Sequence, residues 1–311
     1  ISITMNIKRF SYRGLSPHKF TPMPGVPRNL RQMPFGHCST AALAINMRII
    51  HKNCLSGYFG NVCTVNAVKA RVEGKPSMEL GIPQPLQSLS RHEYNLCLML
   101  ELFDERLRRF EATIDEERPE FGAYSEAMAF LDAVYLFSRM LLDSVAGVVR
   151  HFYKCNENCD LPRSFDDMLK RSVRGKLPDG LNVAFSDCDT WFSQLKDRRD
   201  DIVHHYETYF IGFGQDSEGK MTVVQFSPRN KTRAARDEDL RSYLGLVMAG
   251  YQRFVDCLLD HWDVTFQRWF GIVASINSRQ VTILEGRSAN ILWWAYRYGG
   301  YKHDSLVIDE S

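Results

Sequence analysis

The segment from Tyr124 to Tyr153 carries apolar residues around most of a helical circumference, which limits the architectures open to this chain. A surface helix shows one apolar stripe, whereas a helix that is apolar on nearly every side needs neighbours around it. The apolar positions are Phe130, Leu131, Val134, Phe137, Leu141, Val145, Val148 and Phe152. We therefore predict that this helix lies at the centre of a helical bundle.

Two further long helices are predicted from the same periodicity. One runs from Ser90, which opens a Ser-Arg-His-Glu sequence of capping-box form, to about Ile114. The other runs from Asp237, a candidate N-cap, to about Phe270 and has a broad apolar face. These three helices predict a mainly α fold.

The rest of the chain predicts irregular structure and small β additions. Proline and glycine keep the N-terminal part irregular apart from one helical run, Ser39 to Ile50. Aromatic and β-branched residues on both sides of a turn at 216–220 predict a β-hairpin. Segments 280–284 and 292–296 predict one or two short strands and an aromatic cluster.

These patterns divide the chain into three expected parts. They are an N-terminal accessory region (1–89), a helical bundle (90–209), and a hairpin, long helix and short C-terminal tail (210–311).

Composition excludes several classes of protein. A net charge of +2 does not suit a protein that coats nucleic acid, so contacts with RNA must come from local basic patches. No run of about 18 apolar residues is present, and no secretory signal is recognisable, so we expect a cytoplasmic protein without a membrane span. The eight cysteines are dispersed, as in a reduced protein. His151, Cys155 and Cys159 have the spacing of part of a metal site, but no fourth ligand is apparent, and we predict neither metal nor cofactor.

The segment Asp197–Tyr206 reads Asp-Arg-Arg-Asp-Asp-Ile-Val-His-His-Tyr. It lies in a predicted helix from Trp191 to about Tyr209, where Arg199 falls within the apolar stripe. A guanidinium keeps its charge, so such a position requires an anion or several acceptors nearby. Arg199 and His204 lie about 140° apart on a helical wheel and do not share a face as an i,i+4 pair does.

This segment resembles the signature of the HEPN superfamily, Arg-[Asn/Asp/His]-x-x-x-His, which often continues Val-His-x-Tyr. Arg199 and His204 match its ends, Asp200 fills the polar second place, and Tyr206 follows the histidine by two residues. The resemblance covers mainly 90–209 and implies a HEPN-like antiparallel helical bundle. Preceding amphipathic helices agree with that fold.

The resemblance implies a metal-independent endoribonuclease in which the RNA 2′-hydroxyl attacks the adjacent phosphate. His204 is then the proton-transfer group, Arg199 holds the phosphate oxygens, Asp200 orients the arginine, and Tyr206 donates to phosphate or is a site of regulation. Such sites are shared between two protomers, so a homodimer is expected. A toxin or phage-defence effector is the implied role, with an antitoxin or other regulatory protein as partner.

A basic loop precedes the signature helix and is the predicted RNA contact; its residues are Lys170, Arg171, Arg174 and Lys176. A solvated loop is the alternative. Asp132 and Arg139, seven residues apart in the central helix, either support Arg199 or His204 or pair with each other or with solvent. The whole signature also has a simpler interpretation, namely a charged cluster on an ordinary helix.

The main alternative function is a catalytically inactive helical module for dimerisation or for binding a protein or nucleotide. The sequence contains no P-loop, no Gly-x-Gly-x-x-Gly, no His-Glu-x-x-His and no Gly-x-Ser-x-Gly motif that would indicate other chemistry.

Overall fold

The structure is a computed structural model that describes twelve helices and strands and their immediate surroundings. The described residues are 47–51, 55, 57–60, 62–64, 84–115, 120–170, 175, 177–204, 210–215, 221–226, 239–270, 282–285, 290–303 and 306–310. All of them belong to the larger of two units of the chain, Ser39–Ser311. This unit is mostly helical, as predicted.

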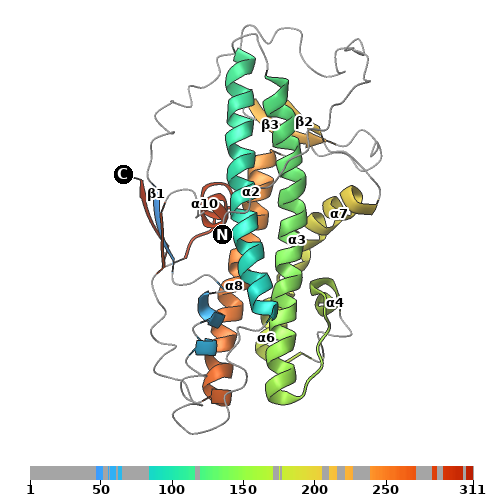
Figure 1. Cartoon of the computed structure of the whole chain (residues 1–311), viewed down its shortest axis with the longest axis vertical. Helices are drawn as coiled ribbons and strands as arrows, with labels where there is room; N and C mark the ends of the chain where they lie inside the picture. The colour runs from blue at the N-terminus through green and yellow to red at the C-terminus, as the bar shows by residue number, and fades with distance from the viewer. Residues whose placement is uncertain are drawn as a thin grey trace, which may run out of the picture. The chain divides into compact units, whose positions relative to one another are not determined.

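The first long helix, α2 (Gln84–Asp115), lies along the second, α3 (Phe121–Glu157), in antiparallel fashion (Figure 1). Two contacts fix the direction: His92 Nδ1 lies 2.7 Å from Ser144 Oγ, and Arg109 Nε donates to Glu120 at 2.6 Å. The facing side chains of α2 are buried: Leu96, Leu100, Phe103 and Leu107. Helix α2 thus covers one side of the apolar surface of α3.

The third long helix, α8 (Leu240–Phe270), completes the core beside α2 and α3. Arg241 donates to both carboxylate oxygens of Glu111 at 2.9 and 2.8 Å, near one end of α2. The Tyr153 hydroxyl lies 2.7 Å from His261 Nε2 at the far end of α3. Therefore α8 runs antiparallel to α2 and in the same direction as α3.

A short helix, α10 (Asn290–Arg297), packs against α8 and α2. Of the one or two short strands and the aromatic cluster predicted for 280–284 and 292–296, a strand forms at Thr282–Glu285 and the Trp293 and Trp294 rings do cluster, but 292–296 is helical. Ile291, Leu292, Trp294 and Ala295 are buried at helical spacing, which an eight-residue segment shows too briefly to be recognised. Gly245 allows the contact, because a Cβ there would lie 2.3 Å from Tyr298 Cβ.

In the described part of the chain, three helices lie between α3 and the first strand of the hairpin: α4 (Phe165–Leu169), α6 (Asp179–Ser186) and α7 (Asp189–His204). Ser164 caps α4, since its side chain accepts from the Asp167 N–H. The sequence showed no periodicity over 180–190, yet α6 forms there. It buries Leu181, Ala184 and Phe185 against α8, so tertiary packing supports a helix too short for a pattern.

The strands that the structure describes form two small antiparallel sheets. β2 (Phe210–Gln215) and β3 (Met221–Phe226) pair where the hairpin was predicted. β1 (Met47–His51) lies between β4 (Thr282–Glu285) and β5 (Val307–Glu310). The helix predicted to end at Ile50 is therefore wrong over its last residues, where a β-branched pair favours a strand, and residues 39–46 lie outside the described residues.

Two predicted helix starts differ from the structure. α2 begins at Gln84 and not at Ser90, so it crosses the expected boundary at 89/90 and leaves the capping-box serine inside the helix. Pro85 is tolerated in the first turn, where a backbone N–H has no intrahelical acceptor. The N–H that proline lacks therefore costs no hydrogen bond. At α8 the backbone N–H of Arg241 donates to Asp239 Oδ1 at 3.1 Å, whereas Asp237 lies outside the described residues. Over the part of the chain that is described, every helix is too short or too polar to cross a membrane.

Candidate functional site

The helix that carries the signature, α7, is held against the core by its first half. Trp191, Phe192 and Leu195 are buried, and they face α3, α4 and α8. At Gly250 of α8 a Cβ would lie 2.5 Å from the Trp191 ring, so the close approach of the helices depends on that glycine. The second half of α7 consequently extends from a rigid base.

Arg198, and not Arg199, is the arginine that meets the core. Its guanidinium lies 3.5 Å from the centroid of the Tyr243 ring and donates to the Tyr135 hydroxyl at 2.9 Å. Arg198 follows Leu195 by three residues and therefore continues the buried stripe of α7. The two tyrosines supply the π face and the acceptor that a half-buried guanidinium requires. Sequence inspection missed this role because nothing in the sequence shows which aromatic rings face α7.

Arg199 lies at the rim, and it contacts both other signature residues that the structure describes. Its Nη1 donates to Asp200 Oδ1 at 2.7 Å and lies 3.2 Å from His204 Nε2. The side chains of Arg199 and Asp200 are 29% and 32% exposed, and His204 is exposed. The angle of about 140° on the helical wheel therefore does not separate the pair, because a long arginine side chain reaches around the helix end.

The chemistry of this contact assigns the state of the imidazole. A guanidinium has only donors, so this contact fits the neutral tautomer of His204 in which Nε2 accepts and Nδ1 holds the proton. Both contacts of Arg199 with described residues use Nη1. Its Nε and Nη2 groups contact no side chain among the described residues. The cluster thus combines a permanent cation, an unprotonated nitrogen and a carboxylate at an exposed helix end.

The two central-helix residues considered as supports show no contact with Arg199, Asp200 or His204, the signature residues that the structure describes. Arg139 lies 3.4 Å from Asp143 and 5.0 Å from the centroid of Phe192, so it steadies the first half of α7. Asp132 lies on α3 between Tyr124 and Tyr135. Tyr135 accepts from Arg198, and Tyr124 donates to the Ile211 carbonyl at 3.2 Å. Burial raises the pKa of the Asp132 carboxyl to about 6.

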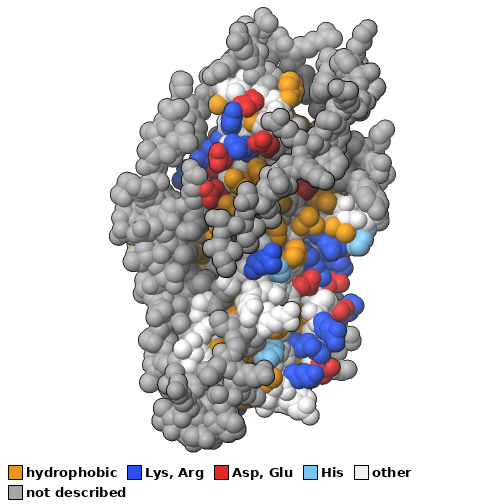
Figure 2. Space-filling model, viewed as in Figure 1, with side chains coloured by type: hydrophobic (Ala, Val, Ile, Leu, Met, Phe, Trp, Pro, Cys, Tyr) orange, Lys and Arg blue, Asp and Glu red, His pale blue; other side chains and the backbone are white. Residues whose placement is uncertain are grey.

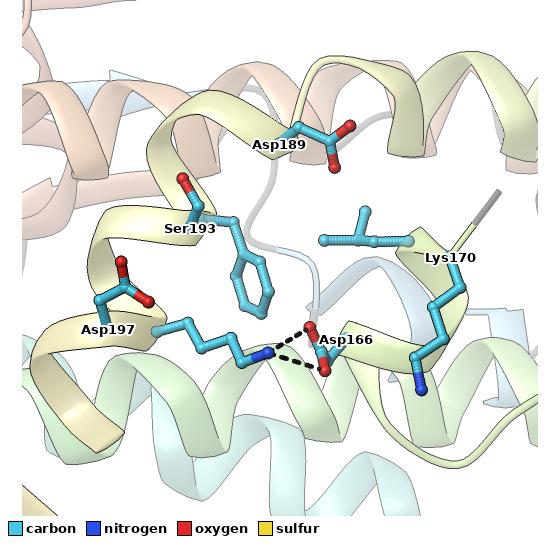
Figure 3. Close-up of a pocket in the computed structure, with 8 residues that line it drawn as sticks. Asp166, Lys170, Asp189, Ser193 and Asp197 are labelled. Atoms are coloured by element: carbon cyan, nitrogen blue, oxygen red, sulfur yellow. Dashed lines mark hydrogen bonds and ion pairs between the residues drawn. The ribbon is translucent and has the colours of Figure 1, made fainter. Parts of the chain in front are cut away.

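A pocket of ≈ 270 Å³ opens between α4 and the first half of α7 (Figure 3). Its lining comprises Asp166, Leu169, Lys170, Asp189, Phe192, Ser193, Lys196 and Asp197. Lys196 Nζ lies 3.1 Å from both carboxylate oxygens of Asp166 and so joins the two helices. Sequence inspection did not anticipate this pocket, since α4 and α7 are brought together only by folding.

Of the predicted RNA-contacting residues, only Lys170 is described. It borders the pocket and forms an ion pair with Asp167, which raises the pKa of Lys170. Arg171, Arg174 and Lys176 lie outside the described residues, as does Tyr206 of the signature. On the face shown in Figure 2, lysine and arginine side chains are interspersed with aspartate and glutamate. The described surface there presents mixed charge.

The possible metal ligands do not form a complete site in the described part of the chain. His151 Nε2 lies 4.0 Å from Cys155 Sγ, and no group of three or more suitable ligands is found among the residues that the structure describes. Comparison with protein-family models, curated proteins and solved structures finds no match.

Proposed function

We propose that this protein is a metal-independent endoribonuclease with a HEPN-like helical domain, and that the Arg199–Asp200–His204 cluster is its active site. One observation carries the proposal: Arg199 Nη1 and His204 Nε2 lie 3.2 Å apart at an exposed helix end. A cation for phosphate and an imidazole for proton transfer are together the two groups that cleavage by an internal hydroxyl needs.

In the proposed reaction, Arg199 binds the scissile phosphate. Its planar fork matches two non-bridging oxygens, and its charge offsets the negative charge that develops as the 2′-hydroxyl attacks. Asp200, whose Oδ1 accepts from Arg199 at 2.7 Å, fixes the guanidinium while leaving other N–H groups for the ligand. Arg199 and Asp200 thus act as one phosphate-holding unit.

His204 is the proposed base. When a phosphate oxygen takes the Nη1 N–H that His204 accepts, the Nε2 lone pair is released and can accept the proton of the 2′-hydroxyl. The oxygen then bonds to phosphorus, the bond from phosphorus to the 5′-oxygen breaks, and that oxygen takes up a proton. The products are a 2′,3′-cyclic phosphate and a 5′-hydroxyl end.

The proposal includes a homodimer in which two such clusters meet, since a second copy supplies a protonated group for the leaving oxygen while the first acts as base. Tyr206 is proposed as a further phosphate donor or a site of regulation. A toxin or phage-defence effector restrained by an antitoxin or other regulatory protein is the proposed setting.

The decisive experiment compares the wild type with the Arg199→Ala, His204→Ala double variant on RNA in the presence of a chelator. We expect new 5′-hydroxyl and cyclic-phosphate ends from the wild type, and a loss of at least about 100-fold in the variant, as for removal of a proton-transfer group. Arg297→Ala, at an exposed arginine ending α10, is the matched control and should cleave as the wild type does.

RNA that stays equally intact with wild type and double variant would refute the proposal. It would favour the catalytically inactive module, for which the same variant should instead weaken dimerisation. Light scattering at several protein concentrations measures that second outcome.

A further inference from the structure

The pocket between α4 and α7 lies on the same side of α7 as His204. Ser193, Asp197, Asp200 and His204 are spaced i, i+4, i+7 and i+11, which places them along one face of the helix. Ser193 and Asp197 line the pocket, and Asp200 belongs to the phosphate-holding unit. From Asp197 to His204 the helix rises about 10 Å. A single RNA strand that lies along this face reaches both the pocket and the phosphate-holding unit.

The size and apolar lining of the pocket suit one flat group. Its volume of ≈ 270 Å³ is just below the range of about 300–1,000 Å³ for drug-sized ligand sites. Leu169 and Phe192 are the buried apolar part of the lining, and the Phe192 ring contacts the Phe165 ring at 5.0 Å and the Arg139 guanidinium at 5.0 Å. The aromatic part of the lining is therefore in place before a ligand arrives.

The polar lining favours a neutral ligand that both donates and accepts. Asp189, Ser193 and Asp197 lie along α7, and Asp166 and Lys170 lie across from them (Figure 3). With Lys196, the lining holds three carboxylates and two ammonium groups and so has a formal charge of −1. The carboxylates disfavour a phosphate, and the lysines disfavour a cation.

Among the four RNA bases, guanine matches this lining best. Its Watson–Crick edge places two N–H donors side by side, which one carboxylate accepts together, and its O6 and N7 atoms accept from a lysine. Adenine and cytosine each offer one amino group, and uracil offers one N–H donor.

We propose that the α4–α7 pocket binds a guanine base of the RNA whose scissile phosphate lies at Arg199 and His204, so that cleavage occurs at a fixed distance from a guanine. This inference rests on the proposed ribonuclease function. A carboxylate of the pocket reads the Watson–Crick edge, and Leu169 and Phe192 support the ring. An N–H of Lys170 or Lys196 that is not used in the ion pair with Asp167 or Asp166 reads O6 and N7.

Binding is tested with 2′-O-methylated oligonucleotides, which cannot supply the attacking hydroxyl and so cannot be cleaved by the proposed reaction. Four strands differ only by guanine, adenine, cytosine or uracil at one position, and fluorescence anisotropy gives their affinities. We expect the guanine strand to bind at least about fivefold more tightly than the others, as for one base read by paired hydrogen bonds.

Ser193→Leu fills the pocket from an exposed helical position and should remove the guanine preference. Gln194→Leu, the adjacent exposed position outside the pocket lining, is the matched control and should keep it. Equal binding of the four strands, absence of binding by all of them, or an unchanged preference in Ser193→Leu would overturn the inference.

Mapping the ends of cleaved RNA separates this inference from the function on which it rests. Cleavage without any preference for a nearby guanine leaves the ribonuclease standing and removes the guanine pocket. Guanine-selective binding without cleavage by the wild type supports the guanine pocket and removes the ribonuclease function.

Discussion

Replacing Asp132 by asparagine should stabilise the protein at neutral pH and not in acid. The carboxyl is half-buried in α3, and burial raises its pKa from the ordinary 3.8 to about 6. A tenfold change in proton affinity corresponds to about 1.4 kcal/mol, so ionisation in the folded state costs roughly 3 kcal/mol before solvent screening. Water reaches part of the side chain, and the discounted cost is about 1–2 kcal/mol.

The direction of the pH dependence follows from proton linkage. Between about pH 4 and pH 6 the unfolded chain has released the Asp132 proton while the folded chain retains it, so rising pH favours unfolding. Above about pH 6 both states are ionised, and the full cost is present. Asparagine carries no charge in either state. Its advantage should therefore be close to zero near pH 4 and should reach about 1–2 kcal/mol near pH 8.

Urea unfolding followed by circular dichroism at the two pH values measures this difference as a shift in the transition midpoint. Asp260→Asn, at an exposed aspartate of α8, is the matched control and should show no comparable gain at neutral pH. The reasoning is refuted if Asp132→Asn gains the same stability at both pH values or is destabilised near pH 8.

Three other substitutions test the packing around α7 and α8. Arg198→Met should lower the free energy of unfolding by about 2–3 kcal/mol, because it removes a charged hydrogen bond and the contact with the Tyr243 ring; chemical denaturation measures it. Gly250→Ala should cost about 1–3 kcal/mol despite the better helix propensity of alanine, since the new Cβ would lie 2.5 Å from Trp191 ring atoms; thermal unfolding with tryptophan fluorescence measures it. Burial lowers the pKa of His261 to about 4, so stability should fall as pH drops from about 6.5 to about 4, and His261→Gln should flatten that slope; a wild-type slope that survives the substitution contradicts the assignment.

The geometry of the proposed site separates two roles of neighbouring arginines. Arg198 holds α7 to the tyrosines of α3 and α8, while Arg199 reaches the exposed cluster with Asp200 and His204. A variant at Arg198 should therefore affect stability first, and a variant at Arg199 should affect RNA cleavage with little change in unfolding. The two residues provide an internal comparison for any activity measurement.

The sequence by itself determined the long helices and the kind of chemistry available at the signature. Apolar periodicity over thirty or so positions averages out single exceptions, so α2, α3 and α8 lie close to where they were predicted. The same argument fails for α6 and α10, because eight residues form only about two turns and their helical state depends on the surfaces they cover.

The tertiary structure alone decided which arginine meets the core and what surrounds the signature. Arg198 follows Leu195 by three residues and Arg199 follows it by four, and an apolar stripe about 100° or more wide can include either position. Two tyrosines distant in sequence place Arg198 at the core. Tyr135 supplies a hydrogen-bond acceptor, and Tyr243 supplies an aromatic ring. The α4–α7 pocket has the same origin, because a hollow between two helices exists only once the core has set their separation.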